Sequence, residues 1–252
     1  DFSKNISEIA RAKDLKIITG SFGEDMADEI LAKHGQFDTI TGSNVFAHNE
    51  DPGSILHAVE ILLKPGGYLC LEVMYAGDLL KSMQWDTLYH EHLTFYSLST
   101  LEGLLAQYDF TIIDVEHISM HGGSIRIIAM KDTKDVVHES VEKLRDYENR
   151  LALSKYQTWL DFGVESKRKI RVVSDSFEEL HKSMKVVAYG AAGKATMWVN
   201  ACNMYYLEYV VDSSPLRAGK LMPGTHTPIY YPKYIEKEKP DIKEPRKGGK
   251  DS

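Results

Sequence analysis

The sequence is poor in the features that mark disulfide-bonded and membrane-spanning proteins. Its 252 residues include only two cysteines, Cys70 and Cys202, which lie far apart within apolar stretches. Two distant cysteines exclude a disulfide framework and a zinc site built from cysteine pairs, and they predict buried thiols in a reducing cytoplasm. No apolar run approaches ~20 residues, so we expect no membrane span. No signal peptide is recognisable, which also favours a cytoplasmic protein.

An excess of positive charge is lacking as well. Thirty lysines and arginines stand against 37 aspartates and glutamates, a formal net charge of −7. A nucleic-acid surface normally shows clustered basic residues, so we expect no nucleic-acid partner. The hydrophobic fraction of 43% is enough for one large core or two smaller ones. The sequence has no internal repeat.

Helical and strand patterns alternate at short spacing up to Met74. Ser3 is typical of a helix N-cap, and Gly35 is typical of a C-cap. The spacing predicts helices at residues 6–13, 23–35 and 51–67 and strands at residues 15–20, 37–46 and 68–74. This alternation predicts a parallel sheet with helices on both faces.

The pattern changes in the middle of the chain. Residues 98–110 are predicted to form a helix capped by Ser99, and residues 111–131 two strands joined around His121, Gly122 and Gly123. These strands would form an antiparallel edge on the parallel sheet. The charge-rich residues 134–184 are predicted to be long surface helices that connect two domains.

A second strand–turn–helix unit begins at Met184. Residues 184–203 predict an apolar strand, a glycine-rich turn and a helix, and residues 207–232 predict a second strand and a long loop. The segment after "EKEKP" is too polar for another buried strand, so we expect this sheet to lack one. The predicted organisation is a catalytic domain at 1–133, a helical connector at 134–184, a smaller Rossmann-like α/β domain at 185–240 and a disordered charged tail at 241–252.

One short run, "DTLYHEHLTFYSL" at residues 86–98, concentrates titratable and aromatic groups. A histidine there could act as a general base, because its pKa lies near neutral. Two histidines in a His-x-His pattern beside a carboxylate could instead bind a metal. The same groups could also form a hydrogen-bonded cluster in a polar core, and the local sequence leaves all three interpretations open.

The order of elements and "LKPGGYLCLEV" at 63–73 resemble the class I S-adenosylmethionine (SAM) methyltransferases. Three further stretches make the resemblance more specific: "SNVFAHNED" at 43–51, "HGGSIR" at 121–126 and "AYGAAGKATMWVN" at 188–200. Together with residues 86–101 they are similar to the sugar C-methyltransferases that alkylate nucleotide-linked keto-deoxysugars, over nearly the whole chain. The resemblance implies a class I methyltransferase sheet, SAM as cofactor and a nucleotide-linked keto-deoxysugar as substrate. Two alternatives are an NAD(P)-dependent oxidoreductase that uses the turn at 189–195 and a non-catalytic fragment that binds sugar nucleotide.

The resemblance also implies roles for individual residues. His92 would be the base that generates an enolate, with hydrogen-bond donors aimed at the ketone oxygen. Glu91 and Tyr89 would lie beside the sugar ring as hydrogen-bonding partners or as a proton donor to its opposite face, while His90 would be structural. The substrate pocket would further contain Asn44, His48, His121 and Gly122. The glycines after His121 would let the backbone approach a ligand closely, although a plain hairpin turn is the other interpretation.

For the cofactor, Asp1 stands where the resembled family has an acidic residue that accepts from both ribose hydroxyls. It could equally be a helix-capping or terminal residue. Ser21, Phe22 and Asn44 would complete the cofactor set. The family's first strand and glycine-rich cofactor loop would precede Asp1, so we expect an N-terminally truncated sheet. The family's cysteine-rich zinc domain is also missing, so we predict no metal.

The glycine-rich turn of the second unit would bind the nucleotide diphosphate of the substrate. Backbone N–H groups at a helix N-terminus suit phosphate oxygens. Ala192 takes the place of the second glycine of G-x-G-x-x-G, so the motif alone is weak. By resemblance the residues that would hold the diphosphate are Tyr189, Gly190, Ala191 and Lys194.

Overall fold

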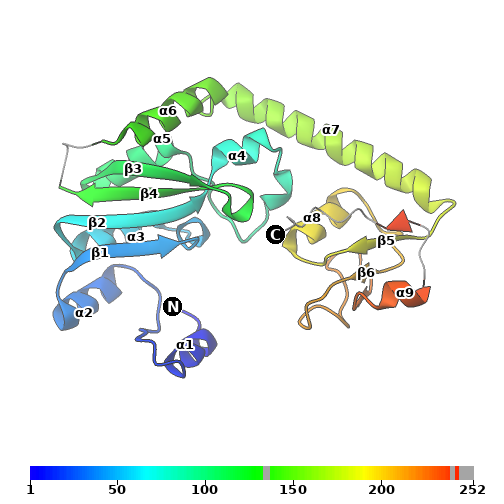
Figure 1. The fold of residues 1–252 in the computed structure, drawn as a ribbon, viewed down its shortest axis with the longest axis horizontal. Coiled ribbons are helices and arrows are strands. Elements are labelled where there is room, and N and C mark those ends of the chain that lie inside the picture. The colour runs from blue at the N-terminus through cyan, green and yellow to red at the C-terminus, as the bar shows by residue number, and fades with distance from the viewer. Residues whose placement is uncertain (133–136, 239–241, 244–252) are drawn as a thin grey trace. The chain divides into compact units, whose positions relative to one another are not determined.

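The structure is a computed structural model that describes residues 1–132, 137–238 and 242–243 (Figure 1). The chain divides into two compact units. The first unit consists of Asp1–Ser82 and Glu91–Thr158, and the second consists of Met83–His90 and Trp159–Ser252. None of the helices in the described part of the chain is both long and apolar enough to cross a bilayer.

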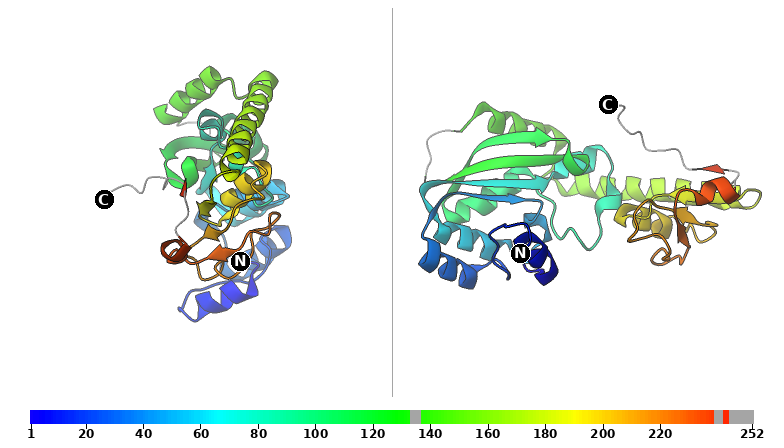
Figure 2. Two further views of the ribbon diagram at one scale, coloured as in Figure 1. Left: turned by 90° about the vertical axis from the view of Figure 1, so that its right-hand side faces the viewer. Right: turned by 60° about the horizontal axis from the view of Figure 1, so that its bottom comes forward.

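The first unit is built on a four-stranded sheet, whose strands lie side by side in Figures 1 and 2. Its strands are β1 (Phe37–Ser43), β2 (Leu63–Met74), β3 (Phe110–Ile118) and β4 (Ser124–Lys131), in the order β1-β2-β4-β3. β1 and β2 are parallel, and β4 runs antiparallel to both of its neighbours. β3 therefore points in the same direction as β1 and β2. The predicted parallel sheet with an added antiparallel strand pair is confirmed for β1, β2, β3 and β4, but the antiparallel strand β4 lies inside the sheet and β3 forms its edge.

Alternate residues of the central strands build the core of this unit. Leu69 and Val73 of β2 and Ile125 and Ile127 of β4 are fully buried on one face of the sheet. The helices of the unit are α1 (Lys4–Arg11), α2 (Glu24–His34), α3 (Pro52–Leu62), α4 (Ala76–Lys81), α5 (Leu98–Leu105) and α6 (Glu139–Leu151), with 3-10 turns η1 (Phe46–His48), η3 (Ala106–Tyr108) and η4 (Met120–Gly122). The amphipathic helices α3 and α5 contribute their apolar stripes to the core, as helical spacing of leucines requires. The leucines of those stripes are Leu56 and Leu62 in α3 and Leu98, Leu101 and Leu105 in α5.

Several helix boundaries follow the predicted signals. The Ser3 hydroxyl accepts a hydrogen bond from the N–H of Ile6, and α2 ends at Gly35, which has a φ of 72°. The predicted Ser99 cap is wrong, because α5 begins at Leu98 and Ser97 is its N-cap. The predicted helix at 51–67 ends at Leu62, and "LKPGG" opens β2 instead.

The strand predicted at residues 15–20 is absent. These residues form no helix or strand, and the side chains of Leu15 and Ile18 are 59% and 43% exposed. Apolar composition favours a strand only where a neighbouring strand offers hydrogen bonds and a surface to pack on. β1 pairs with β2 alone in the described chain, so the segment has no such neighbour.

All four N–H groups at the start of α5 are satisfied, two of them by a distant residue. Ser97 and Thr100 form a reciprocal capping box. The buried carboxylate of Glu148, in α6, accepts from the N–H of Leu98 at 2.5 Å and from the N–H of Ser99 at 3.1 Å. A helix leaves its first four donors without partners, so Glu148 completes this cap and fastens α6 to α5.

The second unit has a parallel four-stranded sheet in the order β7-β6-β5-β8. Its elements are η2 (Trp85–Thr87), α7 (Tyr156–His181, which begins in the first unit), β5 (Val186–Tyr189), α8 (Gly193–Ala201), β6 (Val210–Val211), β7 (Ile229–Tyr230), α9 (Tyr234–Glu238) and β8 (Ile242–Lys243). The predicted strand–turn–helix at the start of this unit is confirmed. The expectation that no strand follows "EKEKP" is wrong, because Ile242 pairs with Val186 and Lys243 with Val187. The rest of the tail predicted at 241–252 lies outside the described residues.

A short segment from early in the chain, residues 83–90, forms part of the second unit. The rings of Trp85 and Trp198 lie 4.6 Å apart, and the Trp198 indole N–H donates to Asp86 Oδ2 at 3.1 Å. A Cβ atom at Gly193 would come within 3.2 Å of the Tyr89 ring. These contacts attach the segment to α8.

Candidate active site

A row of polar side chains crosses the sheet of the first unit near the carboxyl ends of β1 and β2. The strand register pairs Ser43 with Glu72, Glu72 with Arg126, and Arg126 with Glu116. Directly paired residues of neighbouring strands project from the same face. Ligands of open α/β sheets bind outside the carboxyl ends of the parallel strands, so this row lies at the edge where a site is expected.

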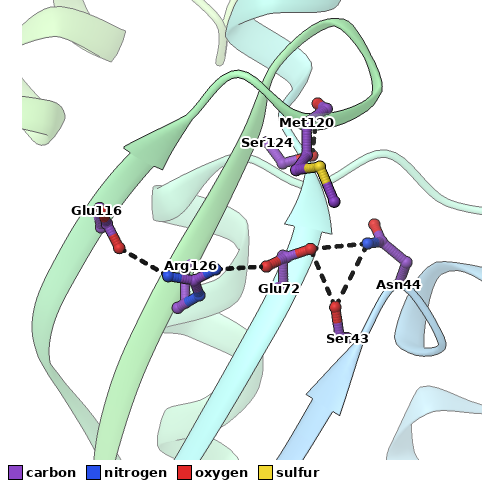
Figure 3. A network of polar contacts seen from close by, with 7 residues as sticks. All are labelled: Ser43, Asn44, Glu72, Glu116, Met120, Ser124 and Arg126. Atoms are coloured by element: carbon purple, nitrogen blue, oxygen red, sulfur yellow. Dashed lines mark hydrogen bonds and ion pairs between the residues drawn. The ribbon is translucent and has the colours of Figure 1, made fainter.

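Glu72 is the centre of the row (Figure 3). Its Oε1 accepts from Ser43 Oγ at 3.0 Å and from Asn44 Nδ2 at 2.8 Å, and its Oε2 accepts from Arg126 Nη2 at 2.9 Å. The other arm of Arg126 donates to Glu116 at 2.8 Å. Burial raises the pKa of Glu72, but the hydrogen bonds from Arg126, Ser43 and Asn44 and the charge of Arg126 outweigh it, so the pKa lies below its ordinary value. Glu72 is therefore a buried, ionised carboxylate.

Asn44 follows β1 directly and has a left-handed backbone, with a φ of 52°. Such a conformation is uncommon outside glycine, and it is enriched at functional sites. It is held by the Asn44 N–H, which donates to the Glu72 carbonyl at 2.9 Å, and by the side-chain contact with the Glu72 carboxylate. Both contacts fix Asn44 at the strand end where the sequence predicted a ligand-binding residue.

His48 and His92 come together beyond Asn44. The N–H of Leu93 donates to the Ala47 carbonyl at 3.0 Å, so the segment after Glu91 lies along η1. The ring centres of His48 and His92 are 5.0 Å apart, with an angle of 33° between the planes. His48 Nδ1 contacts the Glu91 carbonyl oxygen, which can only accept, so Nδ1 carries the hydrogen. In the neutral ring this leaves the Nε2 lone pair available as an acceptor.

The other members of "YHEH" are placed differently. The side chains of His90 and Glu91 are exposed, and Glu91 uses its backbone carbonyl to orient His48. Tyr89 belongs to the second unit, where its ring lies against Gly193 of α8, whereas His92 belongs to the first. The boundary between the two units thus falls inside the motif, between His90 and Glu91.

The "HGG" turn has the unusual backbone that its glycines predict. His121, Gly122 and Gly123 have φ angles of 53°, 91° and 129°. A Cβ atom at Gly123 would lie 2.1 Å from Asp78 Oδ2, so the group that approaches this backbone closely is a carboxylate of the chain itself. Asp78 also contacts His117 Nε2 at 2.5 Å. The side chain of His121 is exposed.

The predicted cofactor residues near the start of the chain lie in two settings. The Gly20 N–H donates to the Asp1 carbonyl at 2.9 Å, which brings Asp1 next to the segment that carries Ser21. The Asp1 carboxylate is exposed and accepts from the Ser3 N–H at 2.8 Å. Ser21 is exposed, while Phe22 packs against the cluster between α2 and α3 and is half-buried.

In the second unit, the glycine-rich turn is held by an acidic residue that the sequence reasoning missed. The Ala191 N–H donates to Asp212 Oδ2 at 2.7 Å, so this N–H is already used within the protein. Burial raises the pKa of Asp212, but hydrogen bonds from the Ala191 and Ser214 N–H groups and the charge of Arg217 bring it below its ordinary value. An acid about 20 residues after such a turn is the usual pattern of a nucleotide-binding βαβ unit, and "VVD" carries that signal.

The remaining predicted residues of this turn differ in exposure. Tyr189 ends β5 with 47% of its surface exposed, and Gly190 has a φ of 101°. Lys194 lies in the first turn of α8, whose N-terminus has no side-chain cap. The first N–H groups of α8 and the Lys194 ammonium group are thus the donors that could meet a phosphate. Within residues 1–132, 137–238 and 242–243, no group of three or more His, Cys, Asp or Glu side chains is placed to hold a metal ion.

In the sheet of the first unit, the antiparallel strand β4 lies between the parallel strands β2 and β3. This sheet, with polar residues at the carboxyl ends of its parallel strands, is that of a class I methyltransferase domain. A family model described as a methyltransferase domain matches residues 2–115. A second, described as the C-methyltransferase C-terminal domain, matches residues 119–244, half of the chain. The chain belongs to this C-methyltransferase family.

Among curated proteins, the chain is similar to the C-methyltransferase NovU of Streptomyces niveus. The two are 29% identical over 245 residues, which cover 96% of this chain and 58% of NovU. Among solved structures, it is similar to a SAM-dependent methyltransferase of Anabaena variabilis (18% identity, 52% of this chain, 66% of that chain, TM-score 0.41). It is also similar to the 1,6-didemethyltoxoflavin-N1-methyltransferase of Burkholderia thailandensis (16% identity, 52% and 57%, TM-score 0.38).

Proposed function

We propose that the protein is a SAM-dependent C-methyltransferase that methylates the carbon beside the ketone of a nucleotide-linked deoxysugar. The observation that carries this proposal is the pair of imidazoles, His48 and His92, at the carboxyl edge of the sheet in a member of the C-methyltransferase family. Alkylation of a carbon beside a ketone begins with loss of a proton, and histidine is the side chain best suited to take it near neutral pH.

His92 is the proposed base, and His48 is its partner. The Glu91 carbonyl keeps the hydrogen of neutral His48 on Nδ1 and orients its ring. His92 would accept the substrate proton beside this oriented ring.

Four further residues are proposed to contact the substrate. Tyr89 and Glu91 would serve the sugar ring as hydrogen-bonding partners, or would return a proton to its opposite face. His121 and Gly122 form a backbone turn with positive φ at both residues, which a ligand could approach closely.

The residues proposed for the cofactor suit parts of SAM. The exposed Asp1 carboxylate can accept from ribose hydroxyls, and the Phe22 ring offers an apolar surface beside Ser21. Asn44 stands at the strand end, where its amide can hold a polar group. When bound, SAM supplies the electrophilic methyl group.

The second unit is the proposed nucleotide-binding part. Lys194 and the N-terminal N–H groups of α8 would bind the diphosphate, with Tyr189 and Gly190 beside it at the end of β5. Because Asp212 occupies the Ala191 N–H, we propose that Ala191 shapes the turn and does not itself donate to phosphate.

Deuterium exchange followed by NMR tests the proposal. The protein is incubated in heavy water with thymidine- and uridine-diphosphate-linked keto-deoxysugars, and loss of the proton beside the ketone is recorded. We expect exchange with at least one of them, its abolition in His92→Asn, and little change in His90→Asn, since His90 is an exposed neighbour of the same type. Exchange that survives in His92→Asn would refute the assignment of the base.

Two further outcomes separate the alternatives. Absence of exchange with every keto sugar, together with tight SAM binding, would mean that the acceptor is wrong. Binding of sugar nucleotide without exchange and without SAM binding would instead favour the non-catalytic alternative. Reduction of the keto sugar on addition of NADPH would favour the oxidoreductase.

A further inference from the structure

A buried carboxylate in the middle of an apolar strand needs a physical reason. Glu72 is only 6% exposed, and its neighbours Leu71 and Val73 are buried apolar residues. Burying a charge costs free energy unless hydrogen bonds and an opposite charge compensate for it. Here three donors converge on Glu72, from Ser43, Asn44 and Arg126. Two of these donors belong to the end of β1, where the site is proposed, so the carboxylate organises that end of the strand.

The contact between Glu72 and Asn44 has a defined polarity. An ionised carboxylate only accepts hydrogen bonds, whereas an amide side chain has a donor end and an acceptor end. The Asn44 NH2 group must therefore face Glu72, at 2.8 Å from Oε1. Its carbonyl oxygen Oδ1 consequently points away from Glu72, as Figure 3 shows. The left-handed backbone of Asn44, tied to the Glu72 carbonyl, prevents the residue from turning as a whole.

We propose that Glu72 is a positioning residue that sets Asn44 as a hydrogen-bond acceptor, so that Asn44 binds an N–H or O–H donor of a ligand. This inference rests on the proposed function. The donor is either a hydroxyl of the sugar or the ammonium group of the methyl donor. Asn44 does not contact the ketone oxygen, which accepts hydrogen bonds in both the ketone and the enolate. The donors for that oxygen must come from other residues.

Arg126 supports this arrangement from the other side of Glu72. It donates to Glu72 and Glu116 through its two arms, so its charge is shared between two carboxylates. The lowered pKa of Glu72 agrees with a carboxylate that stays ionised, which is the state that requires the Asn44 NH2 group to face it. Glu116 is 64% exposed and contacts only the outer arm of Arg126 in this network, so it offers a matched control.

A double-mutant cycle on Glu72 and Asn44 tests the proposal. Glu72→Gln, Asn44→Ala, the double variant and Glu116→Gln are compared with the unsubstituted protein. Calorimetry measures two dissociation constants for each variant. The first is that of S-adenosylhomocysteine, which represents the cofactor. The second is that of the sugar nucleotide found by the exchange experiment, or of a thymidine diphosphate-linked keto-deoxysugar if none exchanges. Thermal unfolding is recorded for every variant.

We expect Glu72→Gln to weaken one of the two ligands by about tenfold, the effect of losing one oriented hydrogen bond. Asn44→Ala should weaken the same ligand by a similar factor. In the Asn44→Ala background, Glu72→Gln should have no further effect on that constant, because Glu72 acts through Asn44. Glu116→Gln should bind both ligands normally. Weakening of S-adenosylhomocysteine assigns the donor to the cofactor, and weakening of the sugar nucleotide assigns it to the substrate.

Other outcomes overturn the proposal. If Glu72→Gln lowers only the unfolding temperature and leaves both constants unchanged, its role is structural. If its effect on binding adds fully to that of Asn44→Ala, Glu72 does not act through Asn44. If binding of S-adenosylhomocysteine shows the predicted non-additive effects but no keto sugar exchanges its proton, this inference is supported and the proposed substrate is refuted. Failure of the unsubstituted protein to bind either ligand would refute both.

Discussion

Replacing Glu148 by glutamine should destabilise the first unit strongly, although the two side chains have nearly the same shape. Glu148 is 4% exposed, and each of its oxygens accepts one backbone N–H from the first turn of α5. A glutamine has one acceptor oxygen, so it can serve only one of these two N–H groups. The other N–H would face the NH2 group of the glutamine.

The expected loss follows from these two contacts. A hydrogen bond to a charged group contributes ~1.5–3 kcal/mol against ~0.5–1.5 kcal/mol for a neutral one, and a buried donor without a partner costs ~1–3 kcal/mol. The negative charge also interacts favourably with the N-terminus of α5. Together these terms predict that Glu148→Gln lowers the free energy of unfolding by about 2–4 kcal/mol. Ser97→Ala removes one conventional cap and should cost about 1 kcal/mol.

Urea unfolding followed by circular dichroism measures these losses. Native-state hydrogen exchange adds a local readout, because the amides of Leu98 and Ser99 should exchange faster in Glu148→Gln. Glu142→Gln, an exposed change in the same helix, is the control and should stay within about 0.5 kcal/mol. A loss below 0.5 kcal/mol for Glu148→Gln, with unchanged exchange at both amides, would refute the account of the cap.

Three further predictions concern the turn after β3, the second unit and the thiols. Gly123→Ala should lower the free energy of unfolding by at least about 2 kcal/mol, because the new Cβ would meet Asp78 and the residue has a φ of 129°. Gly103→Ala, in α5 with open space around it, should raise the free energy of unfolding by about 0.5–1 kcal/mol. Equal effects of the two substitutions in urea unfolding would contradict this. Because the folded protein lowers the pKa of Asp212, the ionised carboxylate stabilises the fold above pH ~4, and this stabilisation is lost as the pH falls. The difference in urea midpoint between the unsubstituted protein and Asp212→Asn should therefore shrink between pH ~7 and pH ~3.5. A difference that stays constant would contradict this prediction. Burial raises the pKa of Cys202 to about 11, so this thiol should react with Ellman's reagent at pH 8 only after unfolding, and reaction in the native protein would be the contrary result.

Local sequence signals predicted the fold best where a residue and its immediate neighbours decide the outcome. Ser3 caps α1 and Gly35 ends α2 as expected, because each acts on the helix beside it. The prediction was wrong at residues 15–20 and at Ile242–Lys243, because strand formation depends on a partner strand that sequence patterns do not reveal. Composition favoured a strand at the first segment and opposed one at the second, and pairing decided both.

The site shows the same division between local and distant information. The sequence placed Asn44 at the end of a strand, and the structure adds that His48 and His92 lie close together beyond it. It gave no indication that Glu72 would pair with Arg126, 54 positions away, because that contact depends on the register between β2 and β4. The single acidic residue in this otherwise apolar strand marks Glu72 as unusual but does not identify its partner.

Residues 83–90 belong to the second unit although the chain on both sides of them belongs to the first, and this limits where the protein can be divided. Because Trp85 and Asp86 pack on Trp198, a fragment that starts anywhere in the helices after residue 137 would lack part of the second unit and uncover an indole. The second unit cannot be exchanged between relatives by a single crossover in those helices, since the eight residues that complete it are encoded inside the other unit. We therefore expect chimaeras to fold only when residues 83–90 and the C-terminal half come from the same parent.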